Sequence, residues 1–197
     1  MLFRSDEFYI LSDSNEINNI FNTFNFKKGK IYNRSDENAQ DDSSTEDAVI
    51  EFLESKKINR NSNLILCQAT SPYLNEKDID NAINLFEESK FNSLLSVVDF
   101  KRFIWNKNGN SVNYNYKDRP RRQDADQYFL ENGALYVSKV QLIKKNSNRL
   151  SNPIGYYVMN ESDYYELDEI EDWEKSEFLF NNKSNKNKND ISKKLKL

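Results

Sequence analysis

Two nearly uninterrupted apolar runs constrain the fold of this chain more than any other feature. They lie within residues 63–68 and 93–98, and each has the length of one β-strand. Continuous apolar sequence predicts strands that are buried on both faces, as in a parallel sheet covered by helices. The residues between the two runs are long enough for the helical crossover that parallel strands require. The chain is therefore expected to contain βαβ units.

The same alternation of strand and helix extends over the first half of the chain. Further short strands are predicted over residues 8–11 and 30–32 in this half, and over residues 133–137 and 154–159 later in the chain. Apolar residues at helical spacing follow Ser14, Ser44 and Asn75, whose side chains can cap a helix, and Ser44 forms a capping box with Asp47. The element order predicts an α/β fold, a three-layer sandwich with a mostly parallel sheet.

The second half of the chain departs from this alternation. The dipeptide Asn108-Gly109 separates two β-like segments and predicts a small hairpin. A final helix is predicted over residues 171–180, with Trp173 and Phe178 as its anchors. We expect one domain over residues 1–180 with an insert at about 100–127, and a disordered Asn/Lys-rich tail over 181–197.

The absence of histidine excludes many kinds of active site. The sequence has no His, a single Cys (Cys67) and four Gly too widely spaced for a phosphate loop. A Ser-His-Asp triad, a His-ligated metal and a Cys-rich zinc site are therefore excluded. Any bound metal must be held mainly by oxygen, which favours Mg²⁺, Mn²⁺ or Ca²⁺.

Charge and hydropathy limit the partners that the sequence suggests. The net charge of −4 provides no general attraction to nucleic acid or to anionic membranes. No apolar run reaches transmembrane length, and residues 1–6 do not form a signal peptide. We expect a cytoplasmic protein that binds neither nucleic acid nor a membrane.

Polar groups follow several of the predicted strands, where ligands bind in open parallel sheets. These groups are Ser12–Ser14, Gln68–Ser71 and the acidic segment 166–172. Glu166 and Asp168 would share one side of an extended segment and could hold a hard cation, whereas the plainer interpretation is a solvated helix start. Asp13 is interpreted either as a helix cap or as a ligand.

Arginine is concentrated in one short segment. Arg119, Arg121 and Arg122 lie within four residues of one another, and guanidinium groups suit phosphate or carboxylate. The plainer interpretation is a basic surface patch.

Four separated segments together resemble the acylneuraminate cytidylyltransferases, also called CMP-sialic acid synthetases. They are residues 64–80 (LILCQATSPYLNEKDID), 118–137 (DRPRRQDADQYFLENGALYV), 166–174 (ELDEIEDWE) and the loop 34–47 (RSDENAQDDSSTED). The similarity extends from about Phe8 to about Leu179. It implies the fold of nucleotide-diphospho-sugar transferases with a small β-hairpin dimerisation insert, and therefore a homodimer.

The resemblance implies a reaction in which CTP and a nonulosonic sugar acid, a sialic-acid-like 2-keto acid, give the CMP-sugar and pyrophosphate. It places Arg34, Asp41, Ser43 and Thr45 in the nucleotide-recognition loop. Gln68, Arg122 and Asn132 would lie on the sugar side, with Gln68, Arg122 and Asp168 in the catalytic set. Asp168 and Glu166 would hold the cofactor, Mg²⁺ or Mn²⁺.

This chain also departs from the family pattern. It lacks the usual N-terminal strand and the glycine loop with Arg and Lys that grips the triphosphate. Glu166 replaces an Asp, and Leu74 and Leu130 stand where many relatives carry Arg. Because the missing strand is usually central, we expect an interrupted sheet. The strand would come from upstream sequence or a second polypeptide, or the gene is a relic.

Two alternatives to an active transferase follow from these departures. The first is a non-catalytic module that keeps the sugar-side residues and the dimer insert for binding or assembly. The second is a nucleic-acid binder, which only the short arginine segment and the aromatic content favour. Saturable binding of Mg²⁺-CTP distinguishes the enzyme from the module.

Overall fold

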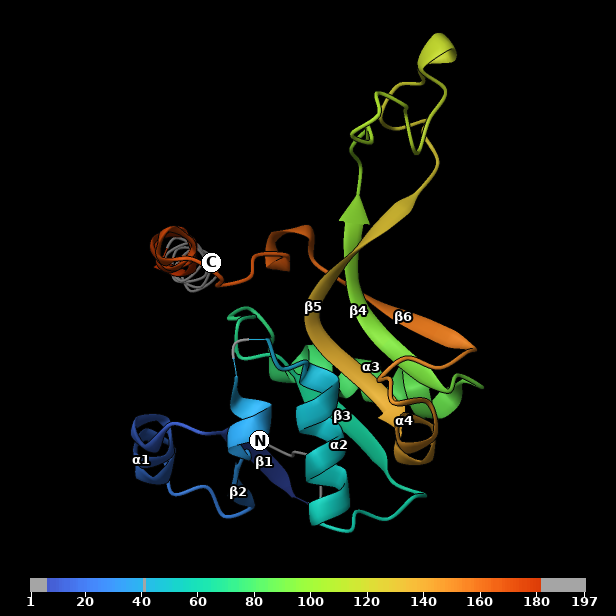
Figure 1. The fold of residues 1–197 in the computed structure, drawn as a ribbon. Helices are drawn as coiled ribbons and strands as arrows, with labels where there is room; N and C mark the ends of the chain where they lie inside the picture. The colour runs from blue at the N-terminus through green and yellow to red at the C-terminus, as the bar shows by residue number, and fades with distance from the viewer. Residues whose placement is uncertain (1–6, 41, 182–197) are drawn as a thin grey trace, which may run out of the picture. The chain divides into compact units, whose positions relative to one another are not determined.

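The computed structural model of the chain describes residues 7–40 and 42–181. Strands and helices alternate along the chain, which confirms the predicted α/β class (Figure 1). The chain divides into two compact units. The first comprises Met1–Leu66, Asn75–Leu95 and Tyr136–Tyr156, and the second comprises Cys67–Leu74, Ser96–Leu135 and Tyr157–Leu197.

The first unit begins with a two-stranded parallel sheet. Strand β1 (Phe8–Ser12) pairs with β2 (Gly29–Asn33), and Ile10 lies opposite Ile31. Helix α1 (Asn15–Thr23) connects them and begins at Ser14, whose hydroxyl accepts the Ile17 N–H. Ser14 is therefore the cap of this helix, and Asp13 is not.

Helix α2 (Thr45–Ser55) packs the apolar core of the first unit. It begins at the predicted capping box, in which Ser44 Oγ accepts the Asp47 N–H at 3.1 Å and donates to its carboxylate at 2.7 Å. Six buried residues form the core cluster, namely Tyr32, Val49, Phe52, Leu53, Val140 and Ile143. The apolar residues that recur at helical spacing on α2 therefore lie at the centre of this core.

A second sheet contains four strands in the order β3-β5-β4-β6. These strands are β3 (Asn63–Cys67), β4 (Ser93–Phe100), β5 (Tyr128–Lys139) and β6 (Ile154–Met159). Among the described residues, β1 and β2 form a sheet of their own, although Leu11 of β1 and Leu66 of β3 pack against the same core cluster. In the described residues the two sheets are therefore separated between β1 and β3.

Two helices complete the first unit. Helix α3 (Glu76–Glu88) begins at Asn75, whose side chain accepts the N–H groups of Lys77 and Asp78. Helix α4 (Val140–Asn146) follows β5 directly and buries Val140 and Ile143. Helix α3 lies where the sequence predicts a helix after Asn75.

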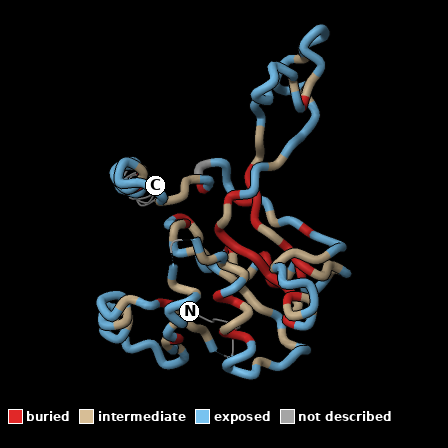
Figure 2. The backbone as a smooth tube through the Cα atoms, in the orientation of Figure 1, coloured by how far each residue is buried: buried red, intermediate tan, exposed pale blue. Residues whose placement is uncertain are grey.

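Strand β5 is longer than predicted, because it begins at Tyr128 rather than near Gly133. Its first five residues, YFLEN, are three apolar residues followed by two polar ones, and they precede the Gly133 at which the sequence prediction begins the strand. Buried residues are concentrated in the later part of β5 and in β4 (Figure 2).

The predicted hairpin turn forms in the segment between β4 and β5. Trp105 and Ser111 form an antiparallel bridge, and Gly109 takes a left-handed conformation with φ of 78°. Arg119 lies over the Phe103 ring, 4.6 Å from its centroid. Most of this segment is exposed (Figure 2).

The helix of residues 170–181 contradicts one prediction. Trp173 and Phe178 are 62% and 67% exposed, so they are not buried anchors. They are five residues apart, about 140° around a helix, and therefore cannot share one buried face. Ser176 is buried instead, and its carbonyl accepts the Tyr73 hydroxyl at 2.8 Å. Asn181 is still helical, and the rest of the predicted tail, 182–197, lies outside the described residues.

None of the helices in the described part of the chain has the length and apolar character needed to cross a membrane.

Candidate active site

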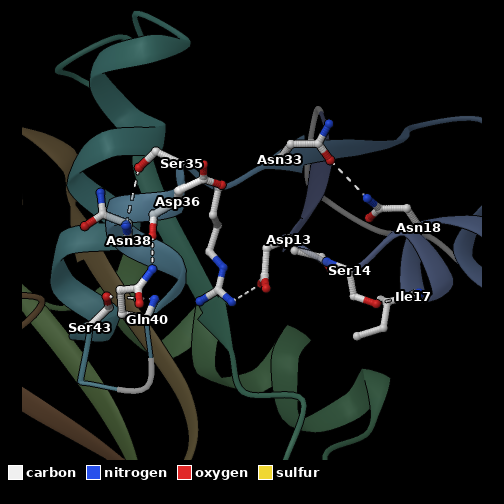
Figure 3. A network of polar contacts seen from close by, with 12 residues as sticks. Asp13, Ser14, Ile17, Asn18, Asn33, Ser35, Asp36, Asn38, Gln40 and Ser43 are labelled. Atoms are coloured by element: carbon white, nitrogen blue, oxygen red, sulfur yellow. Dashed lines mark hydrogen bonds and ion pairs between the residues drawn. The ribbon is translucent and has the colours of Figure 1, made fainter.

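The candidate nucleotide residues lie in the first unit, between the end of β2 and the start of α2. Arg34 directly follows β2, Ser43 lies in the connecting loop and Thr45 is the first residue of α2. Asp41 lies outside the described residues. A polar network holds this region together (Figure 3).

Asp13 holds the side chain of Arg34. Their carboxylate and guanidinium form an ion pair that joins the ends of β1 and β2 (Figure 3). The hydrogen bond from Arg34 lowers the pKa of Asp13. The Nε of Arg34 is buried without a hydrogen-bond partner among the described residues. Asp13 is thus a residue that positions Arg34.

A short 3₁₀ turn organises the loop that the sequence presents as irregular. Turn η1 (Asp36–Ala39) begins at Ser35, whose side chain accepts the Asn38 N–H. Ser43 Oγ accepts the Gln40 N–H at 3.2 Å and donates to the Glu37 carbonyl at 3.0 Å. Ser43 is therefore tied to the turn (Figure 3).

Glu51 of α2 supports this turn through hydrogen bonds. The residue pattern did not predict this role for Glu51. Its carboxylate accepts hydrogen bonds from Tyr32, Ser35 and Asn38. The hydrogen bond from Asn38, followed by those from Ser35 and Tyr32, lowers the pKa of Glu51 to about 2 against the opposing effect of burial. The only signal in the sequence is an acidic residue among the apolar positions of α2.

The sugar-side and metal residues lie in the second unit. Gln68 donates its backbone N–H to the Ala134 carbonyl at 3.1 Å and so extends β3 along β5. Leu167 N–H donates to the Thr70 carbonyl at 2.8 Å. These two bonds bring the loop after β3, strand β5 and the acidic segment together, as predicted for groups at strand ends.

Glu166 packs against the backbone of β5 at Gly133. A Cβ atom at Gly133 would overlap the Glu166 Oε1 atom, and φ there is 65°. Burial, and then the charges of Asp168 and Glu131, raise the pKa of Glu166. Glycine at this position therefore provides the space that the carboxylate occupies.

Asp168 is exposed next to this carboxylate. It lines a hollow of about 350 Å³ together with Leu167, Glu169, Ile170 and Trp173. Residues 164–168 belong to no helix or strand, and the final helix begins at residue 170, so Glu166 and Asp168 lie just before its first turn.

The two remaining sugar-side candidates differ from each other. Asn132 is 2% exposed, and its Nδ2 donates to the Asp163 carbonyl at 3.3 Å while its Oδ1 is buried without a partner. Arg122 is exposed in the segment before β5. In the part of the chain that the structure describes, no hydrogen bond or ion pair joins Arg122 to Gln68 or Asn132.

The donors present fit a hard divalent cation. In the described ranges no three acidic or Cys side chains gather as a complete metal site. Mg²⁺ commonly uses only one or two carboxylates and fills its other positions with water and phosphate oxygens. Glu166 and Asp168 match this requirement. Burial, and after it the charges of Asp168 and Glu131, raise the pKa of Glu166, and a bound cation would offset the charge part of this effect.

Two solved structures share this fold. One is 4-diphosphocytidyl-2C-methyl-D-erythritol synthase from Anaerococcus prevotii, with a TM-score of 0.56 and 12% identity over 80% of this chain and 71% of that chain. The other is CMP:2-keto-3-deoxy-manno-octonic acid synthetase complexed with CTP, with a TM-score of 0.51 and 13% identity over 78% and 72%. The chain thus has the α/β fold of these synthases.

The profile of the family described as Cytidylyltransferase matches residues 4–191, and the chain belongs to this family. It is 34% identical over 152 residues to N-acylneuraminate cytidylyltransferase A of Danio rerio, covering 73% of this chain and 34% of that protein. It is 30% identical to form B of the same fish, covering 85% and 40%. The resemblance seen in the sequence is confirmed, and the chain spans roughly a third to two fifths of these relatives.

Proposed function

We propose that this chain transfers CMP from CTP to a sialic-acid-like 2-keto sugar acid and releases pyrophosphate. The observation that carries the proposal is the carboxylate pair Glu166–Asp168, which the Leu167–Thr70 hydrogen bond ties to the loop that begins at Gln68. Membership of the cytidylyltransferase family and the names of the relatives support the same chemistry.

The proposed reaction is a displacement at phosphorus. The anomeric hydroxyl oxygen of the sugar acid forms a bond to the α-phosphorus, the bond from that phosphorus to the bridging oxygen breaks, and the hydroxyl proton is lost. Such reactions depend mainly on positioning and on neutralising charge. Mg²⁺ or Mn²⁺ at Glu166 and Asp168 would supply part of that neutralisation.

Each remaining candidate residue has a proposed binding role. The nucleotide would contact Arg34, Asp41, Ser43 and Thr45, with the guanidinium of Arg34 held in place by Asp13. The sugar acid would contact Gln68 and Asn132, and Arg122 would offset its negative charge. The fully buried Oδ1 of Asn132 supports a polar role for that residue. A cytoplasmic location is part of this proposal.

One observation favours a second candidate function, a non-catalytic binding or assembly module. Strands β1 and β3 pack against one core cluster, yet the described residues form two separate sheets. A two-stranded sheet is marginal by itself. A module that is completed by further polypeptide would account for this interruption.

Titration and turnover together test the proposed function. Mg²⁺-CTP is titrated into the chain by calorimetry, and pyrophosphate release is then measured with N-acetylneuraminate and, separately, with 3-deoxy-manno-octulosonate. We expect saturable CTP binding and release with the nine-carbon acid. Binding of the sugar acid without any binding of CTP would instead support the module.

A homodimer formed through the hairpin segment is also part of the proposal. Trp105, Val112 and Tyr116 are about half exposed on this segment, and aromatic residues are enriched at the centres of interfaces. Multi-angle light scattering is expected to give twice the chain mass of 23.3 kDa. A mass of one chain at all concentrations tested would contradict the dimer.

A further inference from the structure

The carboxylate of Glu51 collects an unusual number of donors for a side chain outside the predicted site. Its Oε1 accepts the Tyr32 hydroxyl at 2.8 Å and the Ser35 N–H at 3.1 Å. Its Oε2 accepts the Ser35 hydroxyl at 2.8 Å and the Asn38 amide. Both oxygens are therefore fully used in holding neighbouring groups, which leaves this carboxylate a structural rather than a reactive role.

The donors connect the rigid part of the first unit to its loop. Tyr32 is buried in the core cluster, and Glu51 is on the helix that packs this cluster. Ser35 and Asn38 are the start and the third residue of turn η1. Glu51 thus fixes the turn to the core through side chains that are 13 to 19 residues away in the sequence.

Turn η1 also holds two of the candidate nucleotide residues. Arg34 is bonded directly to Ser35 in the chain, and its N–H donates to the Ser12 carbonyl at 3.3 Å. Ser43 is tied to the Glu37 carbonyl and the Gln40 N–H of the same turn (Figure 3). Thr45 lies on α2 itself, the helix that carries Glu51.

We propose that Glu51 is the positioning residue of the nucleotide-recognition loop, which it anchors to helix α2 so that Arg34, Ser43 and Thr45 are presented together. This inference rests on the proposed function for the identity of the ligand, a nucleoside triphosphate. The anchoring of the loop is a separate statement that needs no ligand.

The substitution Glu51→Gln removes one of the two acceptor oxygens and leaves the side-chain volume nearly unchanged. Glutamine has one acceptor oxygen in place of two. Its NH₂ group would face the donor groups whose hydrogen bonds Oε2 accepts in the wild type. Hydrogen bonds to charged groups are worth more than neutral ones. We expect the Kd for Mg²⁺-CTP to rise about tenfold, the loss that one charge-assisted hydrogen bond supplies.

Three measurements are made on the whole chain for wild type, Glu51→Gln and the control Glu54→Gln. Glu54 is exposed on the same helix, so its substitution changes the same charge. Hydrogen exchange reports on the backbone of residues 35–43, and calorimetry gives the affinities for Mg²⁺-CTP and for Mn²⁺. The Mn²⁺ affinity reports on the second unit, which an anchor in the loop leaves unchanged.

In Glu51→Gln we expect faster hydrogen exchange over residues 35–43 and weaker CTP binding, while its Mn²⁺ affinity equals that of wild type. In Glu54→Gln all three measurements are expected to equal those of wild type. Unchanged exchange in the loop, or a parallel loss of CTP and Mn²⁺ binding, would overturn the proposal. If wild type itself fails to bind CTP, the proposed function fails, and the exchange result alone decides whether Glu51 anchors the loop.

Discussion

Asp168→Asn is expected to weaken Mn²⁺ binding at least tenfold and to reduce pyrophosphate release at least about 100-fold. The substitution removes one of two carboxylates that can hold the cation, and an amide oxygen is a weaker ligand for a hard cation. Calorimetry with Mn²⁺ measures the first effect without requiring turnover. The pyrophosphate assay measures the second.

Glu169→Gln provides the matched control for Asp168→Asn. Glu169 lines the same hollow and is also exposed, so its substitution removes one negative charge beside the proposed cation site. We expect the Mn²⁺ affinity of this variant to stay within about twofold of wild type, because salt screens the interaction between an exposed charge and the cation. Equal losses in the two variants would assign the effect to general electrostatics and would refute Asp168 as a ligand.

Gly133→Ala is expected to weaken Mn²⁺ binding as strongly as Asp168→Asn. The new Cβ would overlap the Glu166 Oε1 atom and displace this carboxylate from its position beside β5. The left-handed φ of 65° adds a backbone cost of about 1–2 kcal/mol. Chemical denaturation measures the loss of stability, and calorimetry measures the loss of Mn²⁺ affinity.

Gly109→Ala separates backbone strain from displacement of the carboxylate. Gly109 has a φ of 78°, but a Cβ there would meet nothing within 4 Å. We expect a similar destabilisation of about 1–2 kcal/mol with unchanged Mn²⁺ affinity. Wild-type Mn²⁺ affinity in Gly133→Ala would show that the position of Glu166 does not matter for the cation.

Local patterns in the sequence predicted most of the elements correctly. Apolar periodicity and capping side chains located α2 and α3, because a helix face and its cap depend on residues within a few positions of each other. The same reasoning failed for Trp173 and Phe178, since an aromatic residue in a helix indicates nothing about which element covers it. It also placed the start of β5 at Gly133 rather than Tyr128, because two polar residues and a glycine separate the first apolar residues of the strand from the later ones.

For the candidate site, the residue types and their spacing were enough to define which chemical groups are available. The lack of His and the spacing of Glu166 and Asp168 already limited a metal site to oxygen ligands in one acidic segment. The resemblance to one family added the nucleotide loop, in which Arg34 pairs with Asp13 and Ser43 bonds to Gln40 and Glu37.

Which of these groups contact one another depends on how the chain folds. Glu166 fits against Gly133, 33 positions away, and Glu51 collects donors from β2 and from the turn after it. Neither pair has a local signal, because contacts between distant residues depend on how strands and helices pack rather than on any period along the chain. The interruption between β1 and β3 was expected from the family pattern, but their shared core cluster was visible only after folding.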